Sequence, residues 1–173
     1  MNLLVLGGSL GSEKINEVIS NNLFFFKKNK IKLIWQCGKK YYSRYKDFED
    51  KWINIFPFLE QIEKFYDVCD IIISRAGALT ISELCIVAKP SILIPSPNVS
   101  ENHQLHNAKY LLDRRAAIMI EEQKVDNEFI IELEKLVESR LVRKQLSTAI
   151  CKLAKPDATK DIAFQINKIL ANG

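Results

Sequence analysis

The sequence predicts an α/β fold of the Rossmann-like kind, in which a parallel sheet carries helices on both faces. Short runs of Ile, Leu and Val alternate with longer amphipathic stretches from end to end. Strands that are buried on both faces of a parallel sheet read as continuous apolar runs, and their alternation with helices is typical of such a sheet. We find no internal repeat, low-complexity segment or linker, so residues 1–173 are expected to form a single domain.

The first half of the chain alternates regularly between the two kinds of element. The six predicted strands are residues 3–6, 31–35, 53–56, 71–74, 91–94 and 117–120. Ser12 is a typical N-cap residue and is expected to begin a helix that runs to about residue 28. The apolar face of that helix consists of Ile15, Val18, Ile19 and Leu23.

Further helices are expected at residues 62–66, 80–87 and 104–112. After the last strand the pattern is helical only, with helices at residues 127–138, 142–152 and 157–170. Pro156 stands where the last of these helices would start, and proline is tolerated in a first turn.

Composition excludes several classes of protein. A hydrophobic fraction of 47% and a charged fraction of 27% are typical of a globular chain rather than a disordered one. The net charge of +4, from 25 basic and 21 acidic residues, is too small and too scattered to predict nucleic-acid binding. A weak attraction to an anionic membrane surface and an ordinary solvated basic surface both stay open.

The cysteines and the apolar runs indicate a cytoplasmic protein. Cys37, Cys69, Cys85 and Cys151 lie far apart and form no CxxC pair, so reduced thiols are expected rather than disulfides or a zinc site. No apolar run approaches the ~18 residues that a membrane span needs.

Ligands of Rossmann-like sheets bind beyond the carboxyl ends of the strands, so the loops that follow the strands are the candidate sites. The first of these loops, GGSLGS at residues 7–12, connects a strand to a helix. Its glycines would let a phosphate approach the backbone, and the N–H groups at the helix start attract negative charge. The spacing is neither a dinucleotide fingerprint nor an ATP-type P-loop, and a tight turn without a ligand would look similar.

The second candidate loop connects a buried strand to a helix at residues 71–83. Gly77 allows close backbone approach, and the N–H groups of residues 78–80 could meet phosphate or sugar oxygens. Glu83 could accept two hydrogen bonds from a ribose diol. The alternative is that Glu83 simply complements the helix dipole.

The third candidate loop, at residues 95–104, is stiffened by two prolines and ends at a helix start that carries His103 and Gln104. A glutamine can donate and accept at once, as the recognition of sugar hydroxyls demands. His103 and His106 are three residues apart, but a metal site would need further ligands, so no metal is predicted.

Taken in order, these loops resemble the MurG family, the UDP-N-acetylglucosamine (UDP-GlcNAc) transferases that convert lipid I to lipid II in peptidoglycan synthesis. The resemblance spans essentially the whole chain, and RAGALTISE together with NHQ-x-x-NA is its most specific part. The matching stretches are GGSLGSEKIN (7–16), QCGK (36–39), FPFLEQIEKFYDVCDIIISRAGALTISEL (56–84), IPSPNVSENHQLHNAKYL (94–111) and KPDAT (155–159).

The resemblance implies a role for each matching residue. The phosphate-side loop is represented by Gly8, Ser9 and Gly11, and the segment that holds the uracil by Phe58 and Leu59. The turn that faces the diphosphate and the GlcNAc is represented by Gly77, Ala78, Leu79 and Thr80. The ribose-binding acid corresponds to Glu83, and the pair that reads the GlcNAc hydroxyls to His103 and Gln104. For Arg75, a salt bridge within the fold and a phosphate contact are both open.

The family has two Rossmann-like domains in a GT-B arrangement, and this chain matches the C-terminal, donor-binding one. The resemblance therefore implies an inverting transfer of GlcNAc from UDP-GlcNAc to lipid I, without a metal or other cofactor. The acceptor-binding domain has no counterpart in these residues, so the general base and the contact with lipid I are expected from a missing domain or a partner subunit. No residue of this chain is predicted to be catalytic.

The resemblance also bears on localisation and on the final helix. The protein is expected in the cytoplasm, with a peripheral membrane contact left open, and the final helix could dock on the missing domain. A partner subunit has a precedent, because the eukaryotic dolichol-pathway GlcNAc transferase is divided between a donor-binding chain and a second chain. A non-catalytic UDP-sugar-binding subunit and a transferase with another lipid acceptor remain alternatives.

Overall fold

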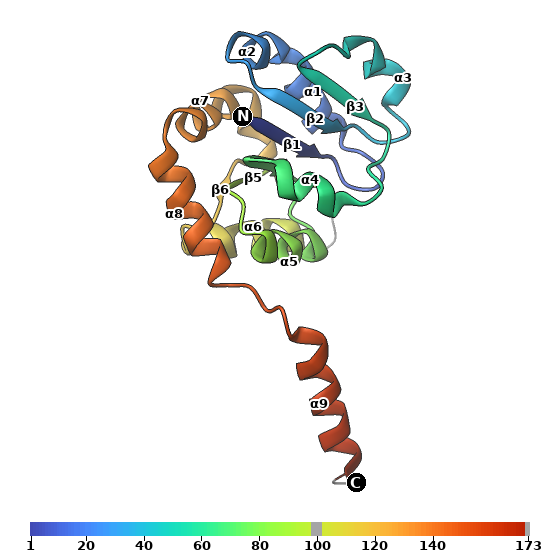
Figure 1. The fold of residues 1–173 in the computed structure, drawn as a ribbon, viewed down its shortest axis with the longest axis vertical. Helices are drawn as coiled ribbons and strands as arrows, with labels where there is room; N and C mark the ends of the chain where they lie inside the picture. Colours follow the sequence, from blue (N-terminus) through green and yellow to red (C-terminus); the bar gives the residue numbers. More distant parts are fainter. Residues whose placement is uncertain (98–101, 172–173) are drawn as a thin grey trace.

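The chain folds around a six-stranded sheet in which every strand pairing is parallel (Figure 1). The computed structural model describes residues 1–97 and 102–171. The strand order is β3-β2-β1-β4-β5-β6. The strands are β1 (Asn2–Leu6), β2 (Lys32–Gln36), β3 (Ile53–Phe56), β4 (Ile71–Ser74), β5 (Ser91–Leu93) and β6 (Ile118–Met119). All six predicted strands are confirmed, with ends that differ by at most one residue.

The helices also follow the predicted pattern. They are α1 (Glu13–Asn21), α2 (Leu23–Lys28), α3 (Tyr42–Tyr45), α4 (Ile62–Val68), α5 (Ala78–Val87), α6 (His103–Asp113), α7 (Val125–Glu138), α8 (Arg140–Cys151) and α9 (Ala158–Ala171). Two short 3-10 helices are η1 (Lys46–Phe48) and η3 (Glu122–Lys124).

The first predicted helix is wrong in its length. Ser12 does cap α1, because its hydroxyl oxygen accepts a hydrogen bond from the Ile15 N–H at 3.3 Å. The helix then ends at Asn21, Asn22 is its C-cap, and α2 begins at Leu23. The Asn22 side chain donates to the Val18 carbonyl at 2.7 Å, and such local side-chain bonds compete with continued helix.

The sequence pattern missed the two short helices α3 and η1 between β2 and β3. Their position is fixed by packing rather than by periodicity. The Tyr45 ring lies 4.8 Å from the Trp35 ring, measured between centroids, and only 2% of Tyr45 is exposed. A four-residue helix is too short for an apolar period to reveal.

Helices cover both faces of the sheet, as predicted. Alternate residues of β1 separate the two cores: Leu3 and Val5 face one side, and Leu4 and Leu6 face the other. The first core is completed by side chains of α1, α2 and α7, and the second by side chains of α4, α5 and α6. Helix α8 contributes Leu146 to the first core and Ile150 to the second.

Helix α9 stands apart from this body. Figure 1 shows it extending away from the sheet and the other helices, and none of its described residues is buried. Ile162, Ile166 and Ile169, three or four residues apart on one face, are each more than half exposed. In the described part of the chain, no helix is long and apolar enough to cross a bilayer.

Candidate functional site

Two adjoining cavities lie at the carboxyl edge of the sheet, where the fold class places a ligand. Their volumes are about 700 and 260 Å³. Both are lined by Gly8, Ser9, Arg75 and Thr80, so they form one continuous depression. We call the first the large cavity and the second the small cavity.

The structure brings together most of the residues predicted to form a site. Those that line the large cavity are Gly8, Ser9, Gly11, Arg75, Gly77, Thr80 and Gln104. Those that line the small cavity are Gly8, Ser9, Phe58, Leu59, Arg75, Leu79, Thr80 and Glu83. Ala78 and His103 line neither cavity. His103 is the exposed first residue of α6, and the part of its loop at residues 98–101 lies outside the described residues.

The glycine loop between β1 and α1 is held tightly against the loop after β2. A side chain on Gly11 would place its Cβ 2.3 Å from the Cys37 carbonyl oxygen, and one on Gly38 would come within 2.5 Å of the Gly11 Cα. Both glycines also have positive φ. Gly11 is therefore required by the packing of two loops. At Gly8, a Cβ would meet nothing within 4 Å, so the backbone there faces open space.

Gln36, which the sequence analysis did not assign to the site, joins the glycine loop to the small cavity. Its side-chain N–H donates to the Gly8 carbonyl at 3.0 Å, and its side-chain oxygen accepts from the Leu59 N–H at 2.9 Å. Only 5% of Gln36 is exposed. The sequence feature that could have indicated Gln36 is a polar residue directly after the apolar run at residues 33–35.

The turn before α5 leaves a helix start without a capping side chain. Gly77 occupies the N-cap position, and the first turn of α5 contains no acidic residue. The first N–H groups of a helix have no intrahelical partner and carry a partial positive charge. The start of α1 lines the same large cavity through Glu13 and Lys14. The starts of two helices thus line one cavity. The start of α1 is already capped by Ser12 and carries Glu13, so the uncapped N–H groups at the start of α5 are the donors best suited to an anion.

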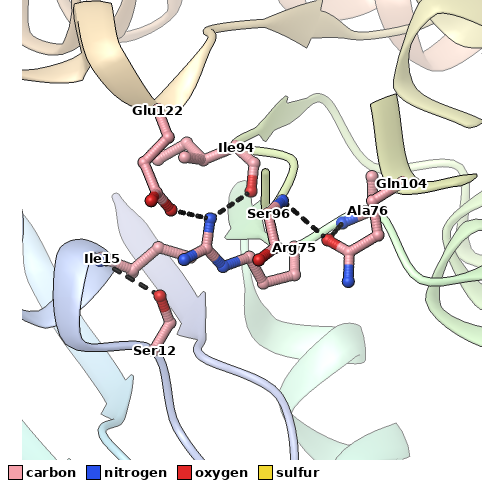
Figure 2. A network of polar contacts seen from close by, with 8 residues as sticks. All are labelled: Ser12, Ile15, Arg75, Ala76, Ile94, Ser96, Gln104 and Glu122. Carbon is pink, nitrogen blue, oxygen red and sulfur yellow. Dashed lines mark hydrogen bonds and ion pairs between the residues drawn. The ribbon is translucent and has the colours of Figure 1, made fainter. Parts of the chain in front are cut away.

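Two amide side chains of α6 clamp the turn that precedes α5. The Gln104 side-chain oxygen accepts hydrogen bonds from the Ala76 N–H at 3.3 Å and the Ser96 N–H at 3.0 Å. The Asn107 side chain donates to the Ala76 carbonyl at 3.0 Å. Because two main-chain donors fix the oxygen of Gln104, its NH₂ group must point the other way, as Figure 2 shows. Gln104 also lines the large cavity, so its NH₂ group remains available as a donor.

Arg75 ties together the loops after three strands. Its guanidinium donates to the Ile94 carbonyl at 3.0 Å and pairs with the Glu122 carboxylate at 2.5 Å (Figure 2). Both side chains are more than four-fifths buried. Of the two roles left open for Arg75, this structure contains the salt bridge, and the phosphate contact stays a prediction. Glu122 was not singled out from the sequence.

The small cavity contains polar groups that can meet hydroxyls. The Tyr66 hydroxyl donates to the Glu83 carboxylate at 2.9 Å. Burial is the main cause, and the Glu83 charge a further one, of a raised pKa for Tyr66, so its hydroxyl stays protonated. The Ser74 hydroxyl is fully buried at the cavity wall and has no hydrogen-bond partner within the described residues. Neither Tyr66 nor Ser74 was predicted from the sequence.

This arrangement can bind an anion beside a group rich in hydroxyls. Across residues 1–97 and 102–171, no three His, Cys, Asp or Glu side chains gather as metal ligands would. The absence of a metal and the individual contacts of each site residue remain predictions.

The strand order, the edge cavities and the helix starts are those of a Rossmann-like ligand-binding domain. Comparison with known proteins narrows this class. The chain belongs to the family described as the glycosyltransferase family 28 C-terminal domain, whose model matches residues 2–162. This confirms the predicted fold, the C-terminal half of a GT-B glycosyltransferase.

Individual relatives agree with this assignment. The chain is 42% identical over 169 residues to a protein of Flavobacterium psychrophilum and 41% identical over 170 residues to one of Christiangramia forsetii. Both are named UDP-N-acetylglucosamine–N-acetylmuramyl-(pentapeptide) pyrophosphoryl-undecaprenol N-acetylglucosamine transferase. The alignments cover 97% and 98% of this chain but 46% of each relative, so the chain spans about half their length.

A solved structure matches equally well. The crystal structure of Acinetobacter baumannii MurG superposes with a TM-score of 0.83 at 30% identity. The match covers 96% of this chain and 49% of that one. The predicted resemblance to the MurG family is thereby confirmed.

Proposed function

We propose that this chain is the donor-binding part of an inverting glycosyltransferase that moves GlcNAc from UDP-GlcNAc to lipid I, forming lipid II. Lipid I is undecaprenyl-diphospho-MurNAc-pentapeptide. The observation that carries the proposal is the pair of joined cavities, the large one lined by the starts of α1 and α5 and the small one by Glu83 beside Phe58 and Leu59. The names of the relatives, which identify both donor and acceptor, support it.

In this proposal each part of the donor occupies a different region of the two cavities. The small cavity, with Phe58 and Leu59 at its wall, would hold the uracil, and Glu83 would accept from the ribose hydroxyls. The diphosphate would lie between the starts of α1 and α5, where the cavities meet. The GlcNAc would occupy the large cavity, within reach of the Gln104 NH₂ group.

Main-chain groups would stabilise the departing diphosphate. The cations nearest the large cavity are already paired, Arg75 with Glu122 and Lys14 with Asp126 at 2.6 Å. Preoriented N–H groups at the two helix starts can stabilise growing negative charge without reorganising. In this proposal the MurNAc C4 hydroxyl attacks the anomeric carbon of GlcNAc, UDP leaves, and no metal takes part. The general base and the lipid I contacts come from an acceptor-binding domain or partner subunit.

Calorimetric titration of this chain with UDP-GlcNAc, with and without Mg²⁺, tests the proposal. UDP-glucose and NAD serve as controls. Saturable, metal-independent binding that favours UDP-GlcNAc is the expected result. A folded chain that binds none of the nucleotides would refute the donor role.

A transfer assay with an added acceptor-binding partner separates the alternatives. Binding of UDP-GlcNAc without GlcNAc transfer in that assay would favour a non-catalytic UDP-sugar-binding subunit. Transfer only to another lipid would identify a different acceptor.

A peripheral membrane contact is part of the proposal because the acceptor is lipid-linked. A groove of about 590 Å³ between the end of α6 and α8 is lined by Arg114, Arg115, Lys144 and Lys152, and by no acidic residue. Leu141 in the same groove is 65% exposed. Basic side chains beside exposed apolar ones suit an anionic lipid surface, at about 1 kcal/mol for each cation near it. Sedimentation with vesicles containing phosphatidylglycerol should be reduced in Lys144→Glu/Lys152→Glu, and equal sedimentation of both proteins would remove this groove from the proposal.

A further inference from the structure

Tyr66 links two helices across the floor of the small cavity. It belongs to α4, is only 4% exposed, and packs in the core beneath the sheet edge. Its hydroxyl reaches the carboxylate of Glu83 on α5, and the donor oxygen lies 2.9 Å from Glu83 Oε2. Both side chains line the cavity. This hydrogen bond joins residues 17 positions apart in the sequence.

The bond is of a kind that fixes an orientation. A neutral hydroxyl that donates to an ionised carboxylate forms a charge-assisted hydrogen bond, which is stronger than a bond between neutral groups. Glu83 is only half-buried, and a glutamate loses considerable rotamer freedom when it is held in one place. Tyr66, by contrast, is packed in the core and only its hydroxyl end faces the cavity side of Glu83. The rigid partner therefore sets the position of the flexible one.

We propose that Tyr66 is a positioning residue, which holds one oxygen of Glu83 so that the other, Oε1, is presented to the vicinal hydroxyls of a bound ribose. This inference rests on the proposed function, because it assigns Tyr66 to the nucleotide end of the same site. Without the Tyr66 hydroxyl, Glu83 would have to be ordered by the ligand itself, and that ordering would weaken binding.

The test compares two ligands that differ only at the ribose. The affinities of the chain for UDP and for 2′,3′-dideoxyuridine diphosphate are measured by calorimetry, and their ratio is the readout. In Tyr66→Phe this ratio should fall about threefold to tenfold, the range expected when one hydrogen bond is lost. Affinity for the dideoxy ligand should not change. A general loosening of the fold would lower both affinities and leave the ratio unaltered.

Tyr45→Phe is the matched control. Tyr45 is also a buried tyrosine, 2% exposed, but it lies in the opposite core, and its hydroxyl has no hydrogen-bond partner within the described residues. Removing that hydroxyl should leave both affinities as they are.

A double-mutant cycle decides whether Tyr66 acts through Glu83. In a Glu83→Ala background, which removes the acceptor of the Tyr66 hydroxyl, Tyr66→Phe should have no further effect on the ratio, whereas an independent effect would overturn the proposal. Should Tyr66→Phe fail to fold, Glu83→Asp replaces it, because the shorter side chain keeps the charge but cannot reach both Tyr66 and the ligand. If Glu83→Asp kept the wild-type ratio of the affinities for UDP and the dideoxy ligand, the proposal would be contradicted.

The outcomes separate this inference from the function on which it rests. If the wild-type chain binds no UDP, the proposed function fails and the inference with it. If it binds UDP with a strong preference over the dideoxy ligand, and Tyr66→Phe keeps that preference, only the role of Tyr66 is lost.

Discussion

Replacing Gln104 by alanine should destabilise the fold even when no ligand is present. The side-chain oxygen of Gln104 accepts from two main-chain N–H groups, and Ala76, which carries one of them, is fully buried. Gln104→Ala leaves the Ala76 N–H without its acceptor. An abandoned buried donor costs about 1–3 kcal/mol, and the second lost bond adds about 0.5–1.5 kcal/mol.

These terms give an expected loss of about 1.5–4.5 kcal/mol. For a domain of this size each kcal/mol lowers the midpoint by about 2–4 °C, so the Tm of Gln104→Ala should fall by roughly 3–18 °C. Differential scanning calorimetry of the ligand-free chain measures this directly. Gln104→Glu is the matched control, because its carboxylate can accept both N–H groups and should keep the Tm near that of the wild type.

A Tm for Gln104→Ala equal to that of the wild type would show that the amide oxygen does not hold the turn. Equal losses in Gln104→Ala and Gln104→Glu would show that side-chain shape, and not the acceptor, is what matters. The clamp also has a consequence for binding. Gln104→Ala releases the turn that begins α5, so it should weaken UDP itself as well as the preference for the sugar.

Three further predictions concern separate parts of the chain. Gly77→Ala should fold with a stability within about 1 kcal/mol of the wild type, since the nearest atom to the new Cβ is 3.9 Å away. It should bind UDP about tenfold more weakly in a titration if a ligand approaches that turn, and unchanged affinity would exclude such an approach. At pH 8 a disulfide reagent should label only the exposed Cys151 rapidly, because burial raises the pKa of Cys69 to about 11 and the remaining thiols are also buried. Rapid labelling of any thiol in the Cys151→Ser variant would contradict this. A hydrogen bond from Lys27 lowers the pKa of Asp50 below its usual 3.8. The ionised Asp50 therefore stabilises the folded state above pH 3.8, and this contribution is lost as the pH falls through the lower pKa of the folded state. The Tm difference between wild type and Asp50→Asn should therefore shrink on acidification from about pH 5 to about pH 2, and a constant difference would argue against the pair.

The fold was predictable because the information lies in local sequence patterns. Each strand is a short apolar run, and burial on both faces requires such a run. The break at Asn22 was not predictable in the same way. An asparagine within an amphipathic stretch is tolerated in many helices, and the sequence does not show that this one leaves the helical conformation and bonds to Val18.

The candidate site was predictable in part. Glu83 and Gln104 were found because each lies near the start of a helix that follows a candidate loop, carries a side chain able to bond hydroxyls, and matches the family motif. The direction of the Gln104 amide could not be predicted from the sequence, since it depends on a main-chain donor 28 residues away. Tyr66 looks like any aromatic residue on an amphipathic helix, and its hydrogen bond to Glu83 arises only when α4 and α5 pack together.

The starts of α1 and α5, which line the large cavity, limit how this site can change by mutation. Its donors belong to the main chain, so a side-chain substitution at a position such as Leu79, which is 75% exposed, alters the surface without deleting a donor. Only a proline, or a change that moves the turn itself, removes one of these N–H groups. An inhibitor that binds through the helix starts would therefore leave few single-residue routes to resistance. Among the glycines of these turns, Gly11 is closed to such a change by the packing of its own loop, because a side chain there would collide with the Cys37 carbonyl.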